Sequence, residues 1–523
     1  MNTTTAETDH VMVGGAELGR CGTRIHHDRF TEAAFEPDPV AQRRIAEGRR
    51  WEETIVRHLL EGSGAVVVDG TADPFDRTRP VMISPGTSRG DREMITLGLL
   101  RAGVPLIVGG RLSDASSRSV GAPDLLVRLD DGYAPVDVKR HKVIGDRGIP
   151  ARLTPIDRLD DTSGARTPFR PERVNDLLQV AHYWTLLETV GHATPRRRVG
   201  VIGSEPSLTC LWADLDDGDP PIDVRYRAAL RDALRVAEAG CVHPNEPLVP
   251  PVWRGQCRSC PWARSCRTEL EAADHVSLLP AVGPTATERL LAAGIETTSV
   301  VAGLAAETLE VLDVSGEARL QARARGAGEL IRRAGADLAL PDVSVEIDFD
   351  IETYGGVLYL AGLLITDEAG SRFEPIADWT GAPEGERLVL AELFAFFDRV
   401  AQRGDAVVYH WTGYERKILN DAARRHGLSL RSASSVDEWF DRFATDLWAW
   451  VKRRFVSPNG YSLKVIAPLC GFDWRDDDPG GAQSELWYAD LLAGADSQRQ
   501  RLLDYNEDDV AAQLAIRRWI RRL

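Results

Sequence analysis

The sequence predicts an α/β protein of two mixed-sheet domains joined by a small helical segment. A chain of 523 residues is too long for one hydrophobic core. Short runs rich in valine, leucine and isoleucine alternate with helical stretches from about residue 20 to 270, and again from about 340 to the end. The stretch between them is rich in alanine, leucine and glutamate, which favours short helices. We therefore expect domains at 1–275 and 339–523, with a helical linker at 276–338.

Composition and charge limit the classes of protein to which this chain can belong. With 43% hydrophobic and 27% charged residues, it has the composition of an ordinary globular protein. No apolar run approaches the roughly 20 residues that cross a bilayer, and the N-terminus has no basic region followed by an apolar core. We therefore expect a cytoplasmic protein without membrane contact. The net charge of -16 argues against coating of nucleic acid by bulk electrostatics, but it is compatible with an enzyme that approaches phosphates through metal ions.

Residues 123–139 are predicted to form a β-hairpin that carries two acids and a lysine. Asp137 and Lys139 stand two positions apart on a strand, so both side chains project from one face. Asp124 can reach them from the partner strand. Two carboxylates can hold Mg²⁺ or Mn²⁺, which polarises a phosphodiester and lowers the pKa of bound water. The lysine can orient that water or stabilise the charge that develops on phosphorus. We expect a first acidic centre here, with Asp124 and Asp137 as metal ligands.

Two predicted helices add residues to this first centre. Glu52 lies in the helical stretch GRRWEETIVRHLL, and Gln179 and Tyr183 stand four positions apart on another helix, where they share a face. With the Pro-Asp and Asp-x-Lys of the hairpin, this pattern resembles the PD-(D/E)xK nuclease superfamily, and the Gln-x-x-x-Tyr spacing resembles its RecB-type branch. The resemblance implies a restriction-endonuclease-like fold and catalytic roles for six residues: Glu52, Asp124, Asp137, Lys139, Gln179 and Tyr183.

Three cysteines within ten residues have the spacing of metal ligands. Cys257, Cys260 and Cys266 form C-x2-C-x5-C, which in a reducing compartment favours metal binding over disulfides. Cys21, ahead of the first centre, is the candidate fourth ligand. One cysteine before the nuclease core and three after it resembles the iron–sulfur RecB-type nucleases, and the resemblance implies a 4Fe–4S cluster that joins the ends of the domain. Four thiolates can also hold Zn²⁺, and this alternative stays open. The remaining cysteines fit no such spacing and are expected to be buried thiols: Cys210, Cys241 and Cys470.

A second acidic centre is predicted in the C-terminal part of the chain. Asp350 and Glu352 lie at the end of an apolar strand and share a face. Asp348 points the same way and is expected to be a neighbour rather than a ligand. Tyr505 and Asp509 stand four positions apart on a predicted helix. Two Mg²⁺ or Mn²⁺ ions about 3.5–4 Å apart on such carboxylates would stabilise the attacking and leaving oxygens of an in-line displacement.

These pieces resemble the DEDD exonucleases of the RNase H-like fold, in the DEDDy variant that has Tyr-x-x-x-Asp as its last motif. The span from about 343 to 523 resembles the YprB-like branch. The resemblance implies 3′→5′ shortening of polymer ends, with Tyr505 helping to position the attacking water. Glu415 stands where the family has an aspartate, and its longer side chain shifts the carboxylate by roughly one bond length, at a site where about 0.5 Å matters. The resemblance implies metal binding by four carboxylates: Asp350, Glu352, Glu415 and Asp509.

The helical linker contains one further motif. Residues 279–285, LPAVGPT, resemble a helix-hairpin-helix unit, which grips a DNA backbone through amides at a helix N-terminus. Thr285 stands where the hairpin usually has its second glycine. A plain helical spacer is the alternative.

These patterns together predict a metal-dependent DNA nuclease that acts in DNA repair. The leading hypothesis is a 3′→5′ exonuclease at the second centre, with the first centre as a second nuclease or a DNA clamp. One alternative gives all cleavage to the first centre and makes the C-terminal domain a binding module. A third is a non-catalytic nucleic-acid-binding or redox-sensing scaffold. We expect DNA, single-stranded or with a 3′ end, as substrate; RNA stays open, and a helicase is a candidate partner.

Overall fold

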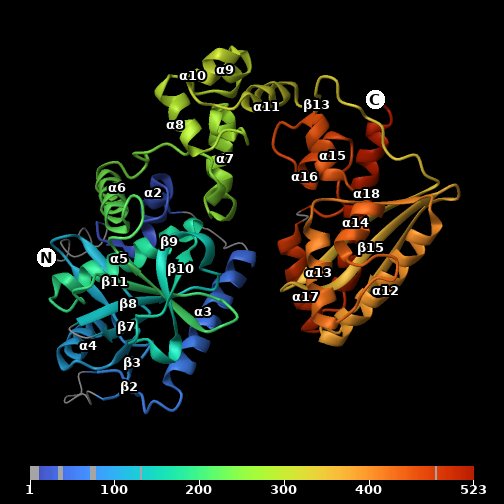
Figure 1. Cartoon of the computed structure of the whole chain (residues 1–523). Coiled ribbons are helices and arrows are strands. Elements are labelled where there is room, and N and C mark those ends of the chain that lie inside the picture. The colour runs from blue at the N-terminus through green and yellow to red at the C-terminus, as the bar shows by residue number, and fades with distance from the viewer. Residues whose placement is uncertain (1–10, 33–38, 71–77, 130–131, 478–479) are drawn as a thin grey trace. The chain divides into compact units, whose positions relative to one another are not determined.

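The computed structural model describes residues 11–32, 39–70, 78–129, 132–477 and 480–523. The chain divides into two compact units, Met1–Pro251 and Val252–Leu523. The first is drawn in blue to green and the second in green to red in Figure 1. Both units combine helices with sheets that contain parallel and antiparallel pairs, so the predicted α/β class with mixed sheets is confirmed. The division between the units falls ahead of the three clustered cysteines, which therefore lie in the second unit.

The first unit is built on a nine-stranded sheet in the order β10-β9-β12-β11-β8-β7-β4-β3-β2. β8 lies at its centre, antiparallel to β7 and parallel to β11, so the predicted hairpin of residues 123–139 is present. A separate three-stranded sheet has the order β1-β6-β5. The strands are β1 (Val13–Gly14), β2 (Val66–Val68), β3 (Val81–Ile83), β4 (Leu106–Val108), β5 (Leu112–Asp114), β6 (Ser119–Gly121), β7 (Leu125–Leu129), β8 (Gly132–Val138), β9 (Ile144–Pro155), β10 (Ala165–Phe169), β11 (Arg198–Ile202) and β12 (Thr209–Asp214).

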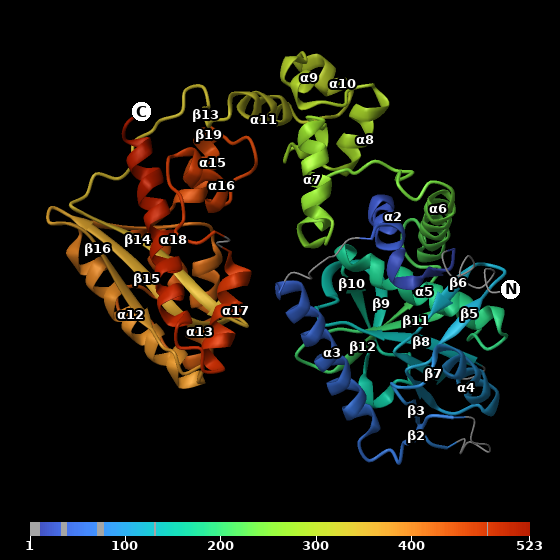
Figure 2. The same ribbon diagram turned by 180° about the vertical axis from the view of Figure 1, so that it is seen from behind.

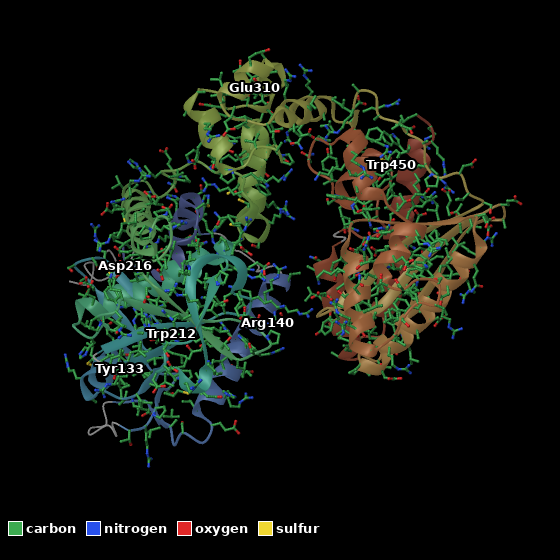
Figure 3. All side chains as sticks on the ribbon, in the orientation of Figure 1. Tyr133, Arg140, Trp212, Asp216, Glu310 and Trp450 are labelled. Atoms are coloured by element: carbon green, nitrogen blue, oxygen red, sulfur yellow. The ribbon has the colours of Figure 1, made fainter. Side chains whose placement is uncertain are left out.

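Helices cover both faces of this sheet, because alternate residues of its strands are apolar on each side. On one face Ile55 of the long helix α3 packs with Ala134 and Val136 of β8 and with Trp212, labelled in Figure 3. On the other face α2, α5 and α6 share one apolar cluster. The helices are α2 (Gly22–Phe30), α3 (Pro39–Leu60), α4 (Arg89–Ala102), α5 (Val174–Thr189) and α6 (Ile222–Val242), with 3₁₀ turns η1 (Gly15–Glu17), η2 (Ile156–Arg158) and η3 (Pro171–Arg173).

The second unit begins with the predicted run of short helices. Their apolar residues form one small cluster of their own. Gly283 precedes α8 and Pro284 opens it, which suits proline because the first helical amides have no partner within the helix. Thr285 is therefore part of the first turn of a helix. The elements are η4 (Gly255–Ser259), α7 (Ala263–Ala272), η5 (Val276–Leu278), α8 (Pro284–Ala292), α9 (Thr298–Gly303), α10 (Ala306–Val311) and α11 (Gly316–Ala327).

A five-stranded sheet in the order β16-β15-β14-β17-β18 follows, with β14 at its centre. β14 and β15 form the predicted hairpin, and β17 lies parallel to β14 on the other side. A short pair, β13 and β19, lies outside this sheet. The strands are β13 (Ile331–Arg332), β14 (Val345–Tyr354), β15 (Val357–Asp367), β16 (Gly370–Ala377), β17 (Ala406–His410), β18 (Ala444–Asp446) and β19 (Phe455–Val456).

The two faces of this sheet carry different helices, as the two opposed views of Figures 1 and 2 show. Ile347, Phe349 and Ile351 of β14 pack against α12, α13 and α14. The intervening residues of β14 are acidic and face α18, which runs along the opposite side. The helices are α12 (Pro383–Arg403), α13 (Tyr414–His426), α14 (Val436–Phe443), α15 (Leu447–Arg454), α16 (Leu463–Leu469), α17 (Gly481–Leu492) and α18 (Gln498–Ile520).

Two sequence expectations outside the acidic centres have clear outcomes. Cys210 and Cys470 are buried as expected, but the expectation for Cys241 was wrong: this cysteine lies in the last turn of α6 with its side chain exposed. The spacing gave no information on which face of the helix it occupies. Among the described residues, no helix combines the length and hydropathy needed to cross a membrane.

Candidate active sites

The first centre forms where β8 ends and α5 passes beside it. Lys139 directly follows β8, and its Nζ lies 2.5 Å from Asp137 Oδ2 and donates a 2.9 Å hydrogen bond to Gln179 Oε1. Gln179 Nε2 in turn donates to the hydroxyl of Tyr183 at 2.7 Å. Asp124 Oδ2 accepts a 2.7 Å hydrogen bond from the backbone amide of the last residue of β8. The structure therefore brings these five predicted side chains together.

Glu52 reaches this centre from α3. Burial raises the pKa of Asp124 well above its ordinary value, and the carboxylates of Asp137 and Glu52 add to the rise. Burial, followed by Asp137, also raises the pKa of Glu52. Burial opposes the charge on Lys139, but the carboxylates of Asp137, Asp176 and Asp124 together outweigh it and raise the pKa of the ammonium group. Three carboxylates around one ammonium group leave an excess of negative charge that suits a divalent cation.

The second centre lies between β14 and α18. One carboxylate oxygen each from Asp350, Glu352 and Asp509 can be chosen so that all three lie within 4.8 Å of one another. β14 supplies the first two because alternate residues of a strand share a face. Asn506 Nδ2 donates to Asp350 Oδ2 at 3.0 Å, and Ser484 Oγ donates to Glu352 Oε2 at 2.8 Å. These donors fix the orientation of both β14 carboxylates.

Burial and the close approach of these acids raise the pKa values of two of them. Burial raises the pKa of Asp350 well above its ordinary value, and Asp509 and Glu352 add to the rise. Burial also raises the pKa of Glu352 to about 8, again with Asp509 as the next cause. Carboxylates this close repel one another unless a cation neutralises them. A set of oxygen ligands with this charge fits Mg²⁺ or Mn²⁺.

Asp509 is held by donors from other elements. Its Oδ1 accepts a 2.7 Å hydrogen bond from Trp474 Nε1 and forms an ion pair with Lys464 Nζ. The same ammonium group lies 4.1 Å from the centre of the Trp474 ring and 4.5 Å from that of Tyr505. Burial, and then Asp509, raises the pKa of Tyr505. The predicted pair Tyr505 and Asp509 thus lies on one face of α18 beside the β14 acids.

Glu415 lies at the start of α13 and is 2% exposed. Its Oε2 is 3.7 Å from Nδ1 of His410, at the end of β17. Burial raises the pKa of Glu415, while His410 opposes the rise and Asp446 adds to it. Glu415 also contributes to the raised pKa of Asp350. It therefore neighbours the centre, but it is not in the set of three whose oxygens approach within 4.8 Å.

A buried ionic contact fixes α18 against β14. Asp348 and Arg517 are both fully buried, and Arg517 Nε and Nη2 donate to the two oxygens of Asp348 at 2.9 and 2.6 Å. Arg517 Nη1 lies 2.7 Å from Glu346 Oε2, and Arg521 pairs with the same carboxylate. Asp348 is thus a neighbour of the centre that positions α18.

The cysteines with ligand spacing belong to two different parts of the chain. Cys257 lies in η4, Cys260 directly follows it, and Cys266 lies in α7. Cys257 is buried and its Sγ accepts a 3.4 Å hydrogen bond from the amide of Arg254, while Cys260 and Cys266 are half-buried. Cys21 is the half-buried residue that precedes α2 in the first unit. Their common cluster stays a prediction.

Several side chains of the second centre could not be assigned from the sequence. Lys464 is a lone lysine in the short apolar stretch SLKVIAPL, and Asn506 directly follows Tyr505. Of these two, only Lys464 carries a signal in the sequence, because a charged side chain within an apolar helix needs a partner. The sequence around Trp474, Ser484 and His410 carries no signal that links them to the acids. Only the fold brings these side chains to the second centre.

Comparison with known proteins gives a match to the C-terminal part of the chain. A family model described as the RNase_H superfamily matches residues 347–521. This segment contains β14, β15, β17 and α18, and with them the whole second centre. Domains of this superfamily are generally phosphodiester hydrolases that act on nucleic acid with the help of divalent metal ions. No curated protein and no solved structure matched the chain.

Proposed function

We propose that this chain, whose residues 347–521 form an RNase H-like superfamily domain, is a metal-dependent DNA nuclease with 3′→5′ exonuclease activity at the second centre. The observation that carries the proposal is the approach of Asp350, Glu352 and Asp509 to within 4.8 Å inside that domain. Their closely spaced carboxylates need a cation for neutrality. The tyrosine four residues before Asp509 matches the DEDDy pattern, which is the argument for the 3′→5′ direction.

The chemistry follows from the geometry of the protein groups. A divalent cation on Asp350, Glu352 and Asp509 would polarise the phosphodiester and lower the pKa of water. Asn506 and Ser484 hold two of these carboxylates in fixed orientations, so little rearrangement is needed when substrate arrives. The Tyr505 hydroxyl interacts with Asp509 and in this proposal would orient the attacking water.

The first centre serves in this proposal as a second nuclease or as a DNA clamp. Its support is the contact of Lys139 with Asp137 and Gln179, together with the raised pKa of Asp124 beside Asp137. This is the arrangement that the RecB-like resemblance implies. The 4Fe–4S cluster on Cys21, Cys257, Cys260 and Cys266, with Zn²⁺ as the alternative metal, and a role in DNA repair belong to the same proposal.

The direct test is degradation of end-labelled DNA in Mg²⁺ or Mn²⁺. A strand labelled at its 5′ end should give a ladder of progressively shorter products, and a strand labelled at its 3′ end should release labelled mononucleotide. Asp350→Asn and Asp509→Asn should abolish this pattern. Asp490→Asn, which changes an exposed acid on α17, is the matched control. Unchanged release by both active-site variants would refute the assignment.

The runner-up gives all cleavage to the first centre. It predicts that Asp137→Asn or Lys139→Met abolishes every product while Asp350→Asn abolishes none. A double variant with one substitution in each centre completes a four-way comparison. A non-catalytic scaffold would bind DNA and leave it intact in all four proteins, with metal present.

A further inference from the structure

The last turn of α15 carries three consecutive cations, Lys452, Arg453 and Arg454. Within the described part of the chain, none of the three forms an ion pair with a carboxylate, although the net charge is -16 and Arg475 of the same unit pairs with three acids. One cation would be enough to stabilise this end of the helix dipole. Burial, and then the charge of Arg453, lowers the pKa of Arg454, while Asp337 opposes the fall. Like charges this close favour the binding of an anion.

Two aromatic rings lie beside these cations. Lys452 Nζ lies 4.6 Å from the centre of the Trp448 ring and 6.0 Å from that of the Tyr461 ring. Trp448 stands four residues before Lys452 on α15, so the two side chains share a face of the helix. Tyr461 is fixed by its hydroxyl, which donates a 3.0 Å hydrogen bond to the carbonyl oxygen of Phe455. Trp448 and Tyr461 are both half-buried, so part of each side chain is open to solvent.

The positive charge continues from α15 to α11. β13 pairs with β19 and thereby brings α11 next to the end of α15 (Figures 1 and 2). Arg333 Nε donates a 3.4 Å hydrogen bond to the carbonyl oxygen of Lys452, and its guanidinium pairs with Glu317 of α11. The contact of Arg325 with Asn459 then borders a cavity of about 620 Å³. The charged side chains that line this cavity are two arginines and one acid: Arg323, Arg325 and Asp274.

The other end of α15 lies at the second centre. Its N-cap, Asp446, is the last residue of β18 and lies beside His410, the last residue of β17. Burial raises the pKa of Glu415, and Asp446 adds to the rise, so this end of the helix is close to the acids. The eight residues of α15 span roughly 12 Å at 1.5 Å per residue. One strand with stacked bases covers that length in about four nucleotides, at about 3.4 Å each.

We propose that the α15 surface, formed by Trp448, Lys452, Arg453, Arg454 and Tyr461, binds a DNA single strand on the 5′ side of the end that the second centre holds. Its cations neutralise phosphates and its two rings stack on bases, which is how single strands are bound without sequence preference. A local excess of positive charge on an acidic chain also directs a polyanion to this side of the unit. The inference rests on the proposed nuclease function and deepens it, because it specifies how the substrate is held beyond its reacting end.

The test compares the KM for release of thymidine nucleotides from a dinucleotide and from an oligothymidylate of about 20 nucleotides, longer than a typical single-strand site. The full chain carries Asp137→Asn, so that only the second centre can cleave. Adding Lys452→Ala and Arg453→Ala should raise the KM of the long strand roughly tenfold and flatten its slope of log KM against log salt by about 1.4, or about 0.7 for each lost phosphate contact. The KM of the dinucleotide should not change, because this substrate ends before the α15 surface.

A second variant, Trp448→Ala, should raise the KM of the long strand at least about fivefold through lost stacking, and Trp448→Phe should restore most of it. The control is Arg387→Ala with Arg403→Ala, which removes two ion-paired cations of α12, on the face of the sheet opposite to the acids. It should change neither KM.

An unchanged KM of the long strand in the cation variant and in Trp448→Ala overturns the inference and leaves the proposed nuclease function intact. An equal rise for the dinucleotide, or an equal rise in the α12 control, overturns it as well. If the Asp137→Asn protein releases nucleotides from neither substrate, the proposed function itself is wrong, and the inference fails with it.

Discussion

The buried pair of Arg517 and Asp348 gives the sharpest prediction about stability. Both side chains are fully buried, and two hydrogen bonds of 2.9 and 2.6 Å join them. Arg517→Met removes the cation but leaves Asp348 buried without its partner. Breaking a buried pair from one side costs about 3–5 kcal/mol. In a domain of this size, about 4 kcal/mol corresponds to a fall in melting temperature of roughly 10 °C.

The assay is differential scanning calorimetry of the full chain at neutral pH. Arg518→Met is the matched control, because this exposed arginine lies next to Arg517 on α18 and should cost less than about 0.5 kcal/mol. Adding Asp348→Leu to Arg517→Met should recover most of the loss, since no charge is then left unpaired. Equal melting temperatures for the two single variants would refute the argument that this contact fixes α18 on β14.

Three further predictions concern other parts of the molecule. Burial lowers the pKa of His182 to about 4 in the folded chain, whereas in the unfolded chain this pKa has its ordinary value of about 6.5. Between these two pH values, only the unfolded chain binds a proton on His182. The first unit should therefore lose up to about 1.4 kcal/mol of stability per pH unit from pH 6.5 down to 4, and His182→Gln should flatten this slope in urea unfolding. Cys257→Ser should remove the proposed 4Fe–4S cluster, and with it the iron and the visible absorption expected of anaerobically purified protein. Tyr414, which is 47% exposed and bonded through its hydroxyl to Thr353 Oγ1 at 2.7 Å, should stack on a base, so Tyr414→Ala should raise the KM for single-stranded DNA at least fivefold, about 1 kcal/mol.

The first of these predictions has an outcome that would contradict it, and the other two have matched controls. An unchanged pH slope in His182→Gln would show that other groups set the acid sensitivity of the first unit. Cys241→Ser changes an exposed cysteine and should keep the iron, whereas zinc in place of iron in the unaltered protein would favour the alternative metal. Tyr414→Phe keeps the ring and should keep the KM; a KM raised equally by Tyr414→Phe would assign the effect to the lost hydroxyl.

Local spacing in the sequence was enough to predict which acids face the same way. Asp350 and Glu352 share a face because side chains alternate along a strand, and Tyr505 and Asp509 share one because a helix repeats after about four residues. The same two rules predicted the hairpin of β7 and β8 and the orientation of Lys139. These are properties of short stretches, so they do not depend on how the rest of the chain packs.

The sequence by itself thus determined the α/β class and which of the predicted acids share a face of a strand or helix. Only the tertiary structure decided what surrounds those acids. Lys464 and Trp474 reach Asp509 from 45 and 35 residues away in the chain, and the pairing of Arg517 with Asp348 spans 169 residues. Contacts across such separations depend on how helices dock on the sheet. No periodicity within a single segment encodes that docking, and so the charge balance of the second centre emerged only from the fold.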